Sequence, residues 1–228
     1  MTNFGFRILP VHNQPNKELV EKFRYIATPH ISDNMNRLNA VGDSLRPYHK
    51  EGKLVGTVVT VKTRNGDNLM VHKAIDLAKP GDIIVVDAGG EVTNAVVGEI
   101  MMRLAQKNGI AGFVIDGAIR DVGAIRNDRF PVYARGVTNR GPYKDGPGEI
   151  NVPISIDGMV VNPGDIIVGD EDGLVVVPYE NAEEILKLAQ TQQKQEVEII
   201  RSIESGDVDR KWVDEILKKK GCEFVDED

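Results

Sequence analysis

The sequence has a single cysteine, few aromatic residues and no long apolar segment. Cys222 cannot form an internal disulfide bond and rules out a metal site built from several cysteines. Aromatic residues make up only 5% of the chain, so nothing indicates a platform for stacking bases. No segment approaches the roughly 18 continuous apolar residues of a membrane-spanning helix, and the first residues lack a signal-peptide pattern. We therefore expect a cytoplasmic protein with no membrane partner.

The chain also lacks the excess of basic residues that nucleic-acid binding needs. Its net charge of −7 and its pI of about 5.2 oppose a general attraction to nucleic acid. None of the patterns GxGxxG, GxxxxGK[S/T] and GxSxG is present, which argues against a nucleotide-binding loop and a serine-hydrolase site. The histidines are scattered without metal-ligand or triad spacing; they are His12, His30, His49 and His72.

Length and composition fit one globular domain with additions at both ends. The chain has 228 residues, of which 41% are hydrophobic and 28% charged. Residues 1–15 contain two prolines and no periodicity, which predicts an N-terminal arm. Helical and strand patterns over residues 16–180 are typical of a layered α/β or an α+β domain. Residues 181–228 are predicted to form a C-terminal helical extension.

Hydrophobic spacing predicts most of the regular elements. A period near 3.6 residues indicates helices, and runs of β-branched residues indicate strands. The predicted helices cover residues 17–27, 32–42, 68–79, 180–206 and 209–221, and the predicted strands cover 53–63 and 82–90, with a compact β layer of short strands between 130 and 178. The polar sequence TQQKQ in the longest helix suggests that this helix extends beyond the domain and packs on a neighbouring subunit.

One octapeptide pattern occurs twice. PGDIIVVD at residues 80–87 returns as PGDIIVGD at residues 163–170. Pro-Gly-Asp is a favourable turn before any buried strand, and the sequences around the two copies do not match. Turn chemistry is therefore favoured over a duplicated domain, and the copies mark two places where the chain enters a sheet.

Gly98 lies in a segment with helical spacing, where a glycine costs about 1 kcal/mol relative to alanine. That cost disappears if the helix begins at Gly98. The backbone N–H groups from Gly98 to Met101, including those of Glu99 and Ile100, would then be free to bind a substrate carboxylate. Alternatively, Val96 and Val97 continue one long helix and Gly98 only lets another element pack closely. The spacing leaves both possibilities open.

A second cluster follows an apolar run that ends in Asp116. Arg120 and Asp121 come next, and all three side chains, with Glu99, are predicted to face one crevice at the carboxyl ends of strands. Three carboxylates without histidine or cysteine would favour Mg²⁺ or Mn²⁺. The competing interpretation is that Arg120 pairs with Asp121 or Asp116, or that Asp121 only caps the next helix. Spacing alone favours ion pairing.

Several segments together make the chain resemble a known family. They are GDNLMVHKAI, PGDIIVVDAGG, GEIMMRLAQKNGIAGFVIDGAIRD and INVPISIDGMVVNPGDIIVGDEDGLVVVP. The chain resembles the superfamily of regulator of ribonuclease activity A (RraA-like), which includes the 4-hydroxy-4-methyl-2-oxoglutarate aldolases, class II pyruvate aldolases. The resemblance implies an α/β fold, a layered α/β/α sandwich similar to the swivelling phosphohistidine domain. It also implies assembly as a homotrimer or homohexamer with active sites between subunits.

The resemblance further implies an activity and a role for each candidate residue. The activity is a divalent-metal-dependent lyase that cleaves 4-hydroxy-2-oxo acids to pyruvate, with oxaloacetate decarboxylase activity and Mg²⁺ or Mn²⁺ as cofactor. The amides of Gly98, Glu99, Ile100 and Met101 would bind the 2-oxo acid substrate, Arg120 would contact it and Asp121 would hold the metal. Glu99 or Asp116 would orient a catalytic water on the metal. Glu196 would reach the site of a neighbouring subunit.

Two alternatives belong to other classes of function. The superfamily also contains proteins that act by binding, such as a ribonuclease E inhibitor, and that role needs only the fold and an acidic surface. A Schiff-base aldolase would need a nucleophilic lysine, for which Lys73 and Lys79 are candidates. Both lysines lie in an amphipathic helical pattern, where solvation is the more ordinary role.

Overall fold

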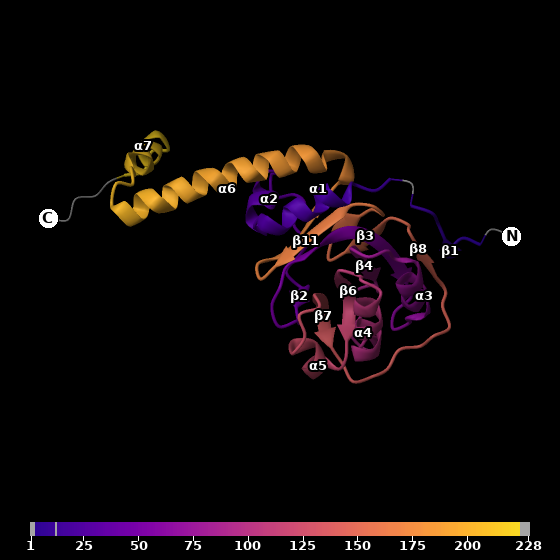
Figure 1. Ribbon diagram of the computed structural model, residues 1–228. Helices are drawn as coiled ribbons and strands as arrows, with labels where there is room; N and C mark the ends of the chain where they lie inside the picture. The colour runs from indigo at the N-terminus through magenta and orange to yellow at the C-terminus, as the bar shows by residue number, and fades with distance from the viewer. Residues whose placement is uncertain (1–2, 12, 224–228) are drawn as a thin grey trace. The chain divides into compact units, whose positions relative to one another are not determined.

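The computed structural model describes residues 3–11 and 13–223 and has a mixed α/β fold (Figure 1). His12 lies outside the described residues. The strands are β1 (Phe6–Ile8), β2 (Arg46–Pro47), β3 (Leu54–Thr63), β4 (Asp82–Asp87), β5 (Ala95–Val97), β6 (Gly112–Ile119), β7 (Val132–Val137), β8 (Gly148–Ile150), β9 (Ile154–Ile156), β10 (Met159–Val161), β11 (Ile166–Asp170) and β12 (Gly173–Val177). The helices are α1 (Lys17–Lys22), η1 (Phe23–Tyr25), α2 (Thr28–Asp33), α3 (Leu69–Leu77), α4 (Glu99–Lys107), α5 (Val122–Arg126), η2 (Tyr179–Asn181), α6 (Ala182–Ser205) and α7 (Lys211–Lys219).

One ten-stranded sheet forms the centre of the fold, with the order β1-β8-β3-β4-β6-β7-β2. Strands β3, β4, β6 and β7 are parallel, and β5 runs parallel beside the end of β6. On the other side of β3 from β4, β11 runs antiparallel and carries β12. The two copies of the repeated octapeptide therefore lead into β4 and β11, on either side of β3, as the sequence predicts.

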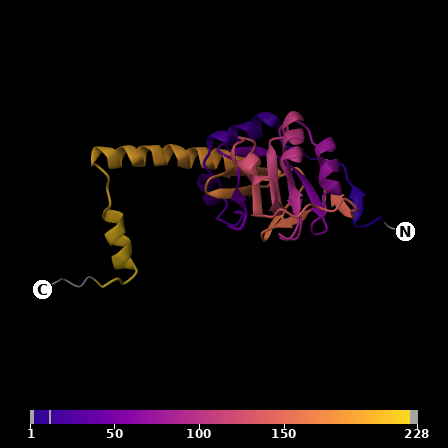
Figure 2. The same ribbon diagram turned by 90° about the horizontal axis from the view of Figure 1, so that it is seen from below.

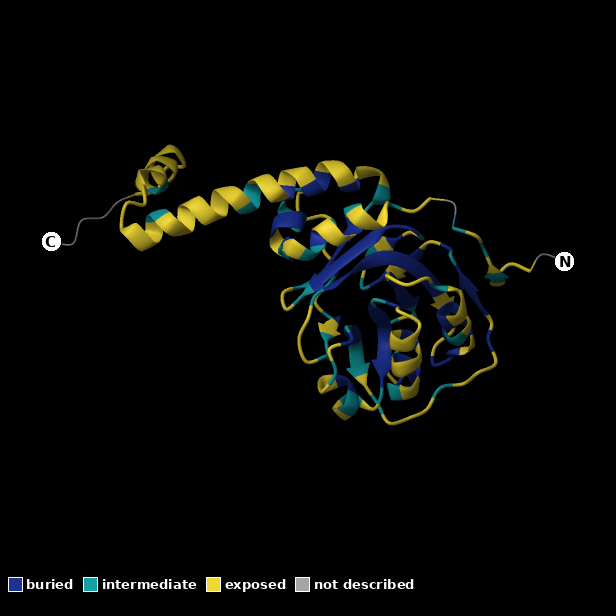
Figure 3. Cartoon of the chain, viewed as in Figure 1, coloured by how far each residue is buried: buried dark blue, intermediate teal, exposed yellow. Residues whose placement is uncertain are grey.

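Helices cover the sheet in two groups. Helices α3 and α4 lie side by side on one face of the parallel strands (Figure 2). Helices α1, η1, α2 and the first turns of α6 pack on β11 and β12. The hairpin of β9 and β10 and the segment before β3 cover the remaining apolar surface. The strands are buried beneath these layers, while the outer helix surfaces are exposed (Figure 3).

The first two helices correct the boundaries predicted from spacing. Thr28 and Pro29 do not end a helix but begin α2, because a proline in the first helical turn has no N–H to leave unpaired. Helix α2 ends at Asp33, well before residue 42. Asn36 and Arg37 have positive φ angles of 55° and 63°, which are incompatible with a continuing right-handed helix.

The region from residue 130 to residue 178 also differs from the prediction. Its short strands are present, but β7, β8, β11 and β12 join the central sheet instead of forming a separate layer. The N-terminal arm likewise contributes β1, which pairs with β8 in parallel. Both results depend on pairing between distant segments, which local patterns do not encode.

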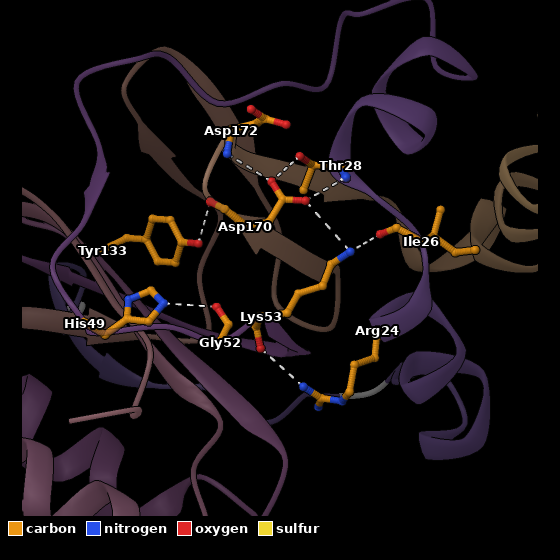
Figure 4. Close-up of polar contacts among 9 residues, drawn as sticks. All are labelled: Arg24, Ile26, Thr28, His49, Gly52, Lys53, Tyr133, Asp170 and Asp172. Atoms are coloured by element: carbon orange, nitrogen blue, oxygen red, sulfur yellow. Dashed lines mark hydrogen bonds and ion pairs between the residues drawn. The ribbon is translucent and has the colours of Figure 1, made fainter. Parts of the chain in front are cut away.

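A partly buried polar group ties the first helices to the end of β11 (Figure 4). The Asp170 carboxylate accepts hydrogen bonds from the N–H and the hydroxyl of Thr28, at 2.9 and 2.5 Å. Lys53 Nζ lies 3.8 Å from the Asp170 carboxylate and also donates to the carbonyl of Ile26. Burial lowers the pKa of Lys53, which Asp170 opposes. The Tyr133 hydroxyl donates to the carbonyl of Asp170 at 2.8 Å, so this group joins β3, β7, β11 and α2.

The chain divides into two compact units within α6. The first contains residues up to Ala189, and the second runs from Gln190 onward. In the first unit α6 buries Ala182, Ile185, Leu186 and Ala189. In the second, α7 ends in a lysine-rich turn before Gly221, whose φ is 78°. Across residues 3–11 and 13–223, every helix is too short or too polar to cross a membrane.

Candidate functional site

A cavity of about 200 Å³ opens at the carboxyl ends of β5 and β6. It is lined by Asn68, His72, Ala95, Val96, Val97, Gly98, Ile100, Met101, Arg120, Asp121, Pro142 and Lys144. These residues come from the start of α3, from β5, Gly98 and the first turn of α4, from the segment after β6 and from the β7–β8 connection. The carboxyl ends of parallel strands are where ligands bind in sheets of this kind.

Helix α4 begins directly after Gly98, which is its N-cap residue. Val96 and Val97 belong to strand β5, so the alternative of one long helix is wrong. The N–H of Glu99 donates to Asp121 Oδ2 at 3.0 Å. Ile100 and Met101 lie in the first helical turn, where backbone N–H groups have no partner within the helix, and both residues line the cavity.

Gly98 is required because two side chains lie against it. A Cβ atom at this position would be 2.5 Å from Asp121 Oδ2 and 2.9 Å from Arg120 Cγ. This closeness follows from strand pairing: Val97 is opposite Ile119, and the N–H of Arg120 donates to the carbonyl of Val97 at 3.0 Å. The two connections therefore leave the sheet together, and the missing side chain lets them touch.

Asp121 adopts a left-handed backbone conformation, with φ 56° and ψ 34°. Such a conformation is uncommon for a residue other than glycine, and aspartate tolerates it better than most. Its side chain does not cap α5. The carboxylate instead lies at the start of α4, 3.7 Å from Arg120 Nε, with both side chains about 40% exposed. A weak ion pair of this kind leaves the guanidinium and carboxylate available to a ligand.

Three cavity residues carry functional groups that the sequence analysis did not select. His72 lies one turn into α3, and burial lowers its pKa, with a further contribution from the ammonium of Lys144. Lys144 lies on the β7–β8 connection and brings a second positive charge to the cavity. Asn68 is 2% exposed and donates from Nδ2 to the carbonyl of Val96 at 2.9 Å. Its buried Oδ1 accepts no hydrogen bond from the described part of the chain.

Asp116 does not share this cavity, which corrects the prediction that it ends its strand beside Arg120. Strand β6 continues to Ile119, and Asp116 is only 4% exposed. Its Oδ1 accepts from Arg135 Nε at 2.6 Å, and its Oδ2 accepts from the N–H of Asp157 at 3.0 Å. Asp116 is therefore engaged in a structural ion pair elsewhere in the fold.

The other predicted site residues do not line this cavity. The Glu99 side chain bonds Arg103 one turn along α4, at 2.7 Å, and is absent from the residues lining the cavity. Lys73 is exposed and lies 3.9 Å from Asp76, and neither Lys73 nor Lys79 lines the cavity. Glu196 lies in α6, in the second unit of the chain.

Asp121 provides the only carboxylate among the described residues that line the cavity. Across residues 3–11 and 13–223, no three His, Cys, Asp or Glu side chains are close enough together to hold a metal ion, so the expected three-carboxylate site is not formed. Mg²⁺ commonly binds one or two carboxylates, keeps several waters and takes the remaining oxygens from its substrate. A partly exposed carboxylate beside a cavity meets that requirement.

Comparison with known proteins assigns the chain to a family. The family described as RraA-like, aldolase/RraA, matches residues 28–176. The chain belongs to the RraA-like family. A protein of Halalkalibacterium halodurans, provisionally named a 4-hydroxy-4-methyl-2-oxoglutarate aldolase, is 42% identical over 181 residues, 79% of this chain and 86% of its own. The 4-hydroxy-4-methyl-2-oxoglutarate aldolase of Thermus thermophilus is 32% identical over 66% of this chain and 92% of its own.

Solved structures have the same RraA-like fold. An uncharacterized protein from Pseudomonas syringae superposes with a TM-score of 0.77 and 29% identity, over 86% of this chain and 96% of its own. The RNA-processing inhibitor RraA of Thermus thermophilus superposes with a TM-score of 0.63 and 31% identity, over 67% of this chain and 92% of its own. Relatives of this chain thus include both aldolases and a protein described as an inhibitor of RNA processing.

Replacing Asp116 by alanine should destabilise the fold much more than replacing Glu99 by alanine. Asp116→Ala leaves Arg135 without one of its partners and the N–H of Asp157 without its acceptor, which should lower the free energy of unfolding by about 2–3 kcal/mol. Glu99→Ala removes a surface ion pair, which contributes about 0–1 kcal/mol. Urea unfolding followed by circular dichroism measures both. Equal losses for the two variants would contradict the structural role of Asp116.

Proposed function

We propose that this chain is a divalent-metal-dependent lyase that cleaves 4-hydroxy-2-oxo acids of the 4-hydroxy-4-methyl-2-oxoglutarate type to pyruvate. The observation that carries the proposal is the composition of the cavity. It combines the N-terminus of α4, the guanidinium of Arg120, the ammonium of Lys144 and the carboxylate of Asp121. The aldolase names of two relatives support the same class of reaction.

The cavity offers separate positions for the two ends of a dicarboxylic substrate. The N–H groups of Ile100 and Met101, in the first turn of α4, would bind the carboxylate of the pyruvate moiety. Arg120 then contacts the neighbouring keto oxygen, where negative charge develops during cleavage. Lys144 lies on another wall and binds the distal carboxylate. The substrate is thereby held at both ends, and its C3–C4 bond lies between Arg120 at one end of the cavity and Lys144 at the other.

Cleavage requires a base for the 4-hydroxyl proton. His72 lines the cavity, and its lowered pKa keeps the imidazole neutral at pH 7, so that it can accept that proton. As the hydroxyl oxygen forms a carbonyl, the C3–C4 bond breaks and its electron pair forms the enolate of pyruvate. The imidazolium of His72 returns the proton to C3, which gives pyruvate and restores the neutral base. Asp116 is engaged with Arg135, and Glu99 with Arg103, so His72 replaces them as the proposed base.

Asp121 is the residue that would hold Mg²⁺ or Mn²⁺. The bound cation supplies a Lewis acid for the oxygen that becomes negatively charged. Oxaloacetate loses CO₂ through the same enolate, so we propose decarboxylation as a companion activity. Decarboxylation has no hydroxyl proton to remove and needs Arg120 and Asp121 but no base.

Turnover should depend on the metal and on Asp121. We expect pyruvate release from 4-hydroxy-4-methyl-2-oxoglutarate and from oxaloacetate with Mg²⁺, loss of both with EDTA, and a loss of at least about 100-fold in Asp121→Ala. A lactate dehydrogenase assay measures the pyruvate. Borohydride reduction in the presence of pyruvate serves as a control, because covalent labelling of Lys144, Lys73 or Lys79 would replace metal catalysis with a Schiff base.

A methyl group at position 98 should impair the site while preserving the fold. In Gly98→Ala the new Cβ displaces Asp121 and Arg120, and misplacement of about 1 Å can lower a rate about 100-fold. Gly123→Ala is the matched control, because its Cβ would meet nothing within 4 Å. We expect kcat/KM to fall in the first variant alone, at similar melting temperatures. Unchanged kcat/KM in Gly98→Ala would count against this cavity as the active site.

Glu196 is proposed to complete the site of a neighbouring subunit in a homotrimer or homohexamer. If so, one subunit contributes Asp121 to the site and its neighbour contributes Glu196. Asp121→Ala and Glu196→Ala then remove residues that come from different subunits. Co-expression of the two inactive variants with different tags should then yield mixed oligomers that recover part of the turnover. Sedimentation of the purified oligomer gives its subunit number. No recovery in mixed oligomers would remove Glu196 from the proposed site.

A binding role is the second candidate, because the chain resembles an RNA-processing inhibitor in structure. Such a role needs an acidic surface, which the net charge of −7 supplies. The turnover assay separates the two candidates. A folded protein without turnover under any of the metal conditions would favour binding over catalysis.

A further inference from the structure

One wall of the cavity comes from the start of α3, and another comes from the connection between β7 and β8. Asn68 directly precedes α3, and His72 follows it one turn later. Pro142 and Lys144 lie in the connection between β7 and β8, which contains only an isolated bridge between Tyr143 and Asp67. The position of the Lys144 ammonium therefore depends on what holds this connection.

One buried carboxylate contacts both walls. Asp67 has no exposed surface. Its Oδ1 accepts from the N–H of Leu69, the first residue of α3, at 2.9 Å. Its Oδ2 accepts from the N–H groups of Asp145 and Gly146 at 2.8 and 3.0 Å, and Arg64 lies 3.4 Å from the same oxygen. Asp67 thus links the start of α3 to the residues directly after Lys144.

Backbone hydrogen bonds complete the attachment on the other side of Lys144. The N–H of Asn68 donates to the carbonyl of Tyr143 at 3.0 Å, and the N–H of Tyr143 donates to the carbonyl of Gly66 at 2.8 Å. Lys144 is consequently held through both of its chain neighbours. Its own side chain is left to reach the cavity.

The carboxylate form of Asp67 suits this role. Burial alone would raise its pKa, but the N–H groups of Leu69, Asp145 and Gly146 and the charge of Arg64 together hold the pKa below its usual value. Asp67 therefore stays ionised at neutral pH. An asparagine would keep one acceptor oxygen and would turn an N–H₂ group toward backbone N–H donors, so one of the two walls would lose its partner.

We propose that Asp67 is a positioning residue that sets where Lys144 meets the distal carboxylate of the substrate. This inference rests on the proposed function, since it assumes a dicarboxylic 2-oxo acid in the cavity. Asp67 acts through Lys144 and touches no substrate atom. Its loss should affect the distal end of the ligand and spare the end bound by Arg120.

Calorimetric binding of two probes with Mg²⁺ present tests the proposal. Oxalate resembles the pyruvate enolate and needs the Arg120 end only, whereas 2-oxoglutarate also has a distal carboxylate and no 4-hydroxyl. In Asp67→Asn we expect about tenfold weaker binding of 2-oxoglutarate and unchanged binding of oxalate. Lys144→Met should show the same pattern. The double variant should bind 2-oxoglutarate no more weakly than Lys144→Met does, because both changes remove the same contact with the distal carboxylate.

Controls separate positioning from general damage. Asp165 is a matched buried carboxylate, 3% exposed, that accepts from backbone N–H groups of Asn162 and Tyr179 and does not line this cavity. Asp165→Asn should leave both affinities unchanged. If Asp67→Asn does not fold, Arg64→Ala removes only the partly exposed partner and should weaken 2-oxoglutarate alone, by a smaller factor.

The outcomes are distinct. Equal weakening of both probes in Asp67→Asn, or additive effects in the double variant, would overturn the positioning role and leave the proposed function standing. Unchanged binding of both probes in a folded Asp67→Asn variant would also overturn the positioning role and leave the proposed function standing. Failure of the unaltered protein to bind either acid would overturn the proposed function, and the inference with it.

Discussion

The hydrogen bond from the N–H of Glu99 to the carboxylate of Asp121 joins the two connections on which the cavity depends. It can form because β5 and β6 end side by side and because Gly98 has no Cβ to separate them. It also uses the left-handed backbone of Asp121, a conformation that costs of order 1–3 kcal/mol and persists only where its surroundings impose it. Arg120 is carried into place by the same arrangement. Strand pairing thus brings the start of α4, Arg120 and Asp121 together at one end of the cavity.

Charge at the site differs from charge over the whole molecule. The chain carries a net charge of −7, yet its cavity contains Arg120 and Lys144 together with the start of a helix. Net charge governs solubility and long-range attraction, whereas affinity for a small dianion depends on fixed charges within a few ångströms. Burial is the main cause of the lowered pKa of His72, and the ammonium of Lys144 adds to it, because a protonated imidazole beside a second cation would be unfavourable. The imidazole of His72 and the ammonium of Lys144 therefore line one cavity without both carrying a positive charge at neutral pH.

The sequence predicts those parts of the fold and site that local patterns determine. The long helix and the strands after each PGD turn are confirmed, because periodicity and turn chemistry act over a few residues. At Gly98 the sequence leaves two alternatives open, and the structure decides for a helix that starts there. Asp116 was misplaced because Gly117, Ala118 and Ile119 continue the apolar run, which hides the true end of β6. Its partner Arg135 lies on another strand. No local sequence pattern predicts the ion pair between Asp116 and Arg135.

His72 and Lys144 show why the rest of the site could not be predicted. Each is unremarkable in its own segment, and they line one cavity because Asp67, together with backbone hydrogen bonds of Asn68 and Tyr143, attaches the β7–β8 connection to the start of α3. Burying a carboxylate costs several kcal/mol unless its oxygens are satisfied, and apolar side chains could hold a loop without that cost. A carboxylate adds direction, because each hydrogen bond constrains both distance and angle. A binding surface tolerates small displacements, whereas cleavage of one chosen bond does not. The buried hydrogen bonds of Asp67 therefore favour the proposed lyase over a protein that acts by surface contact alone.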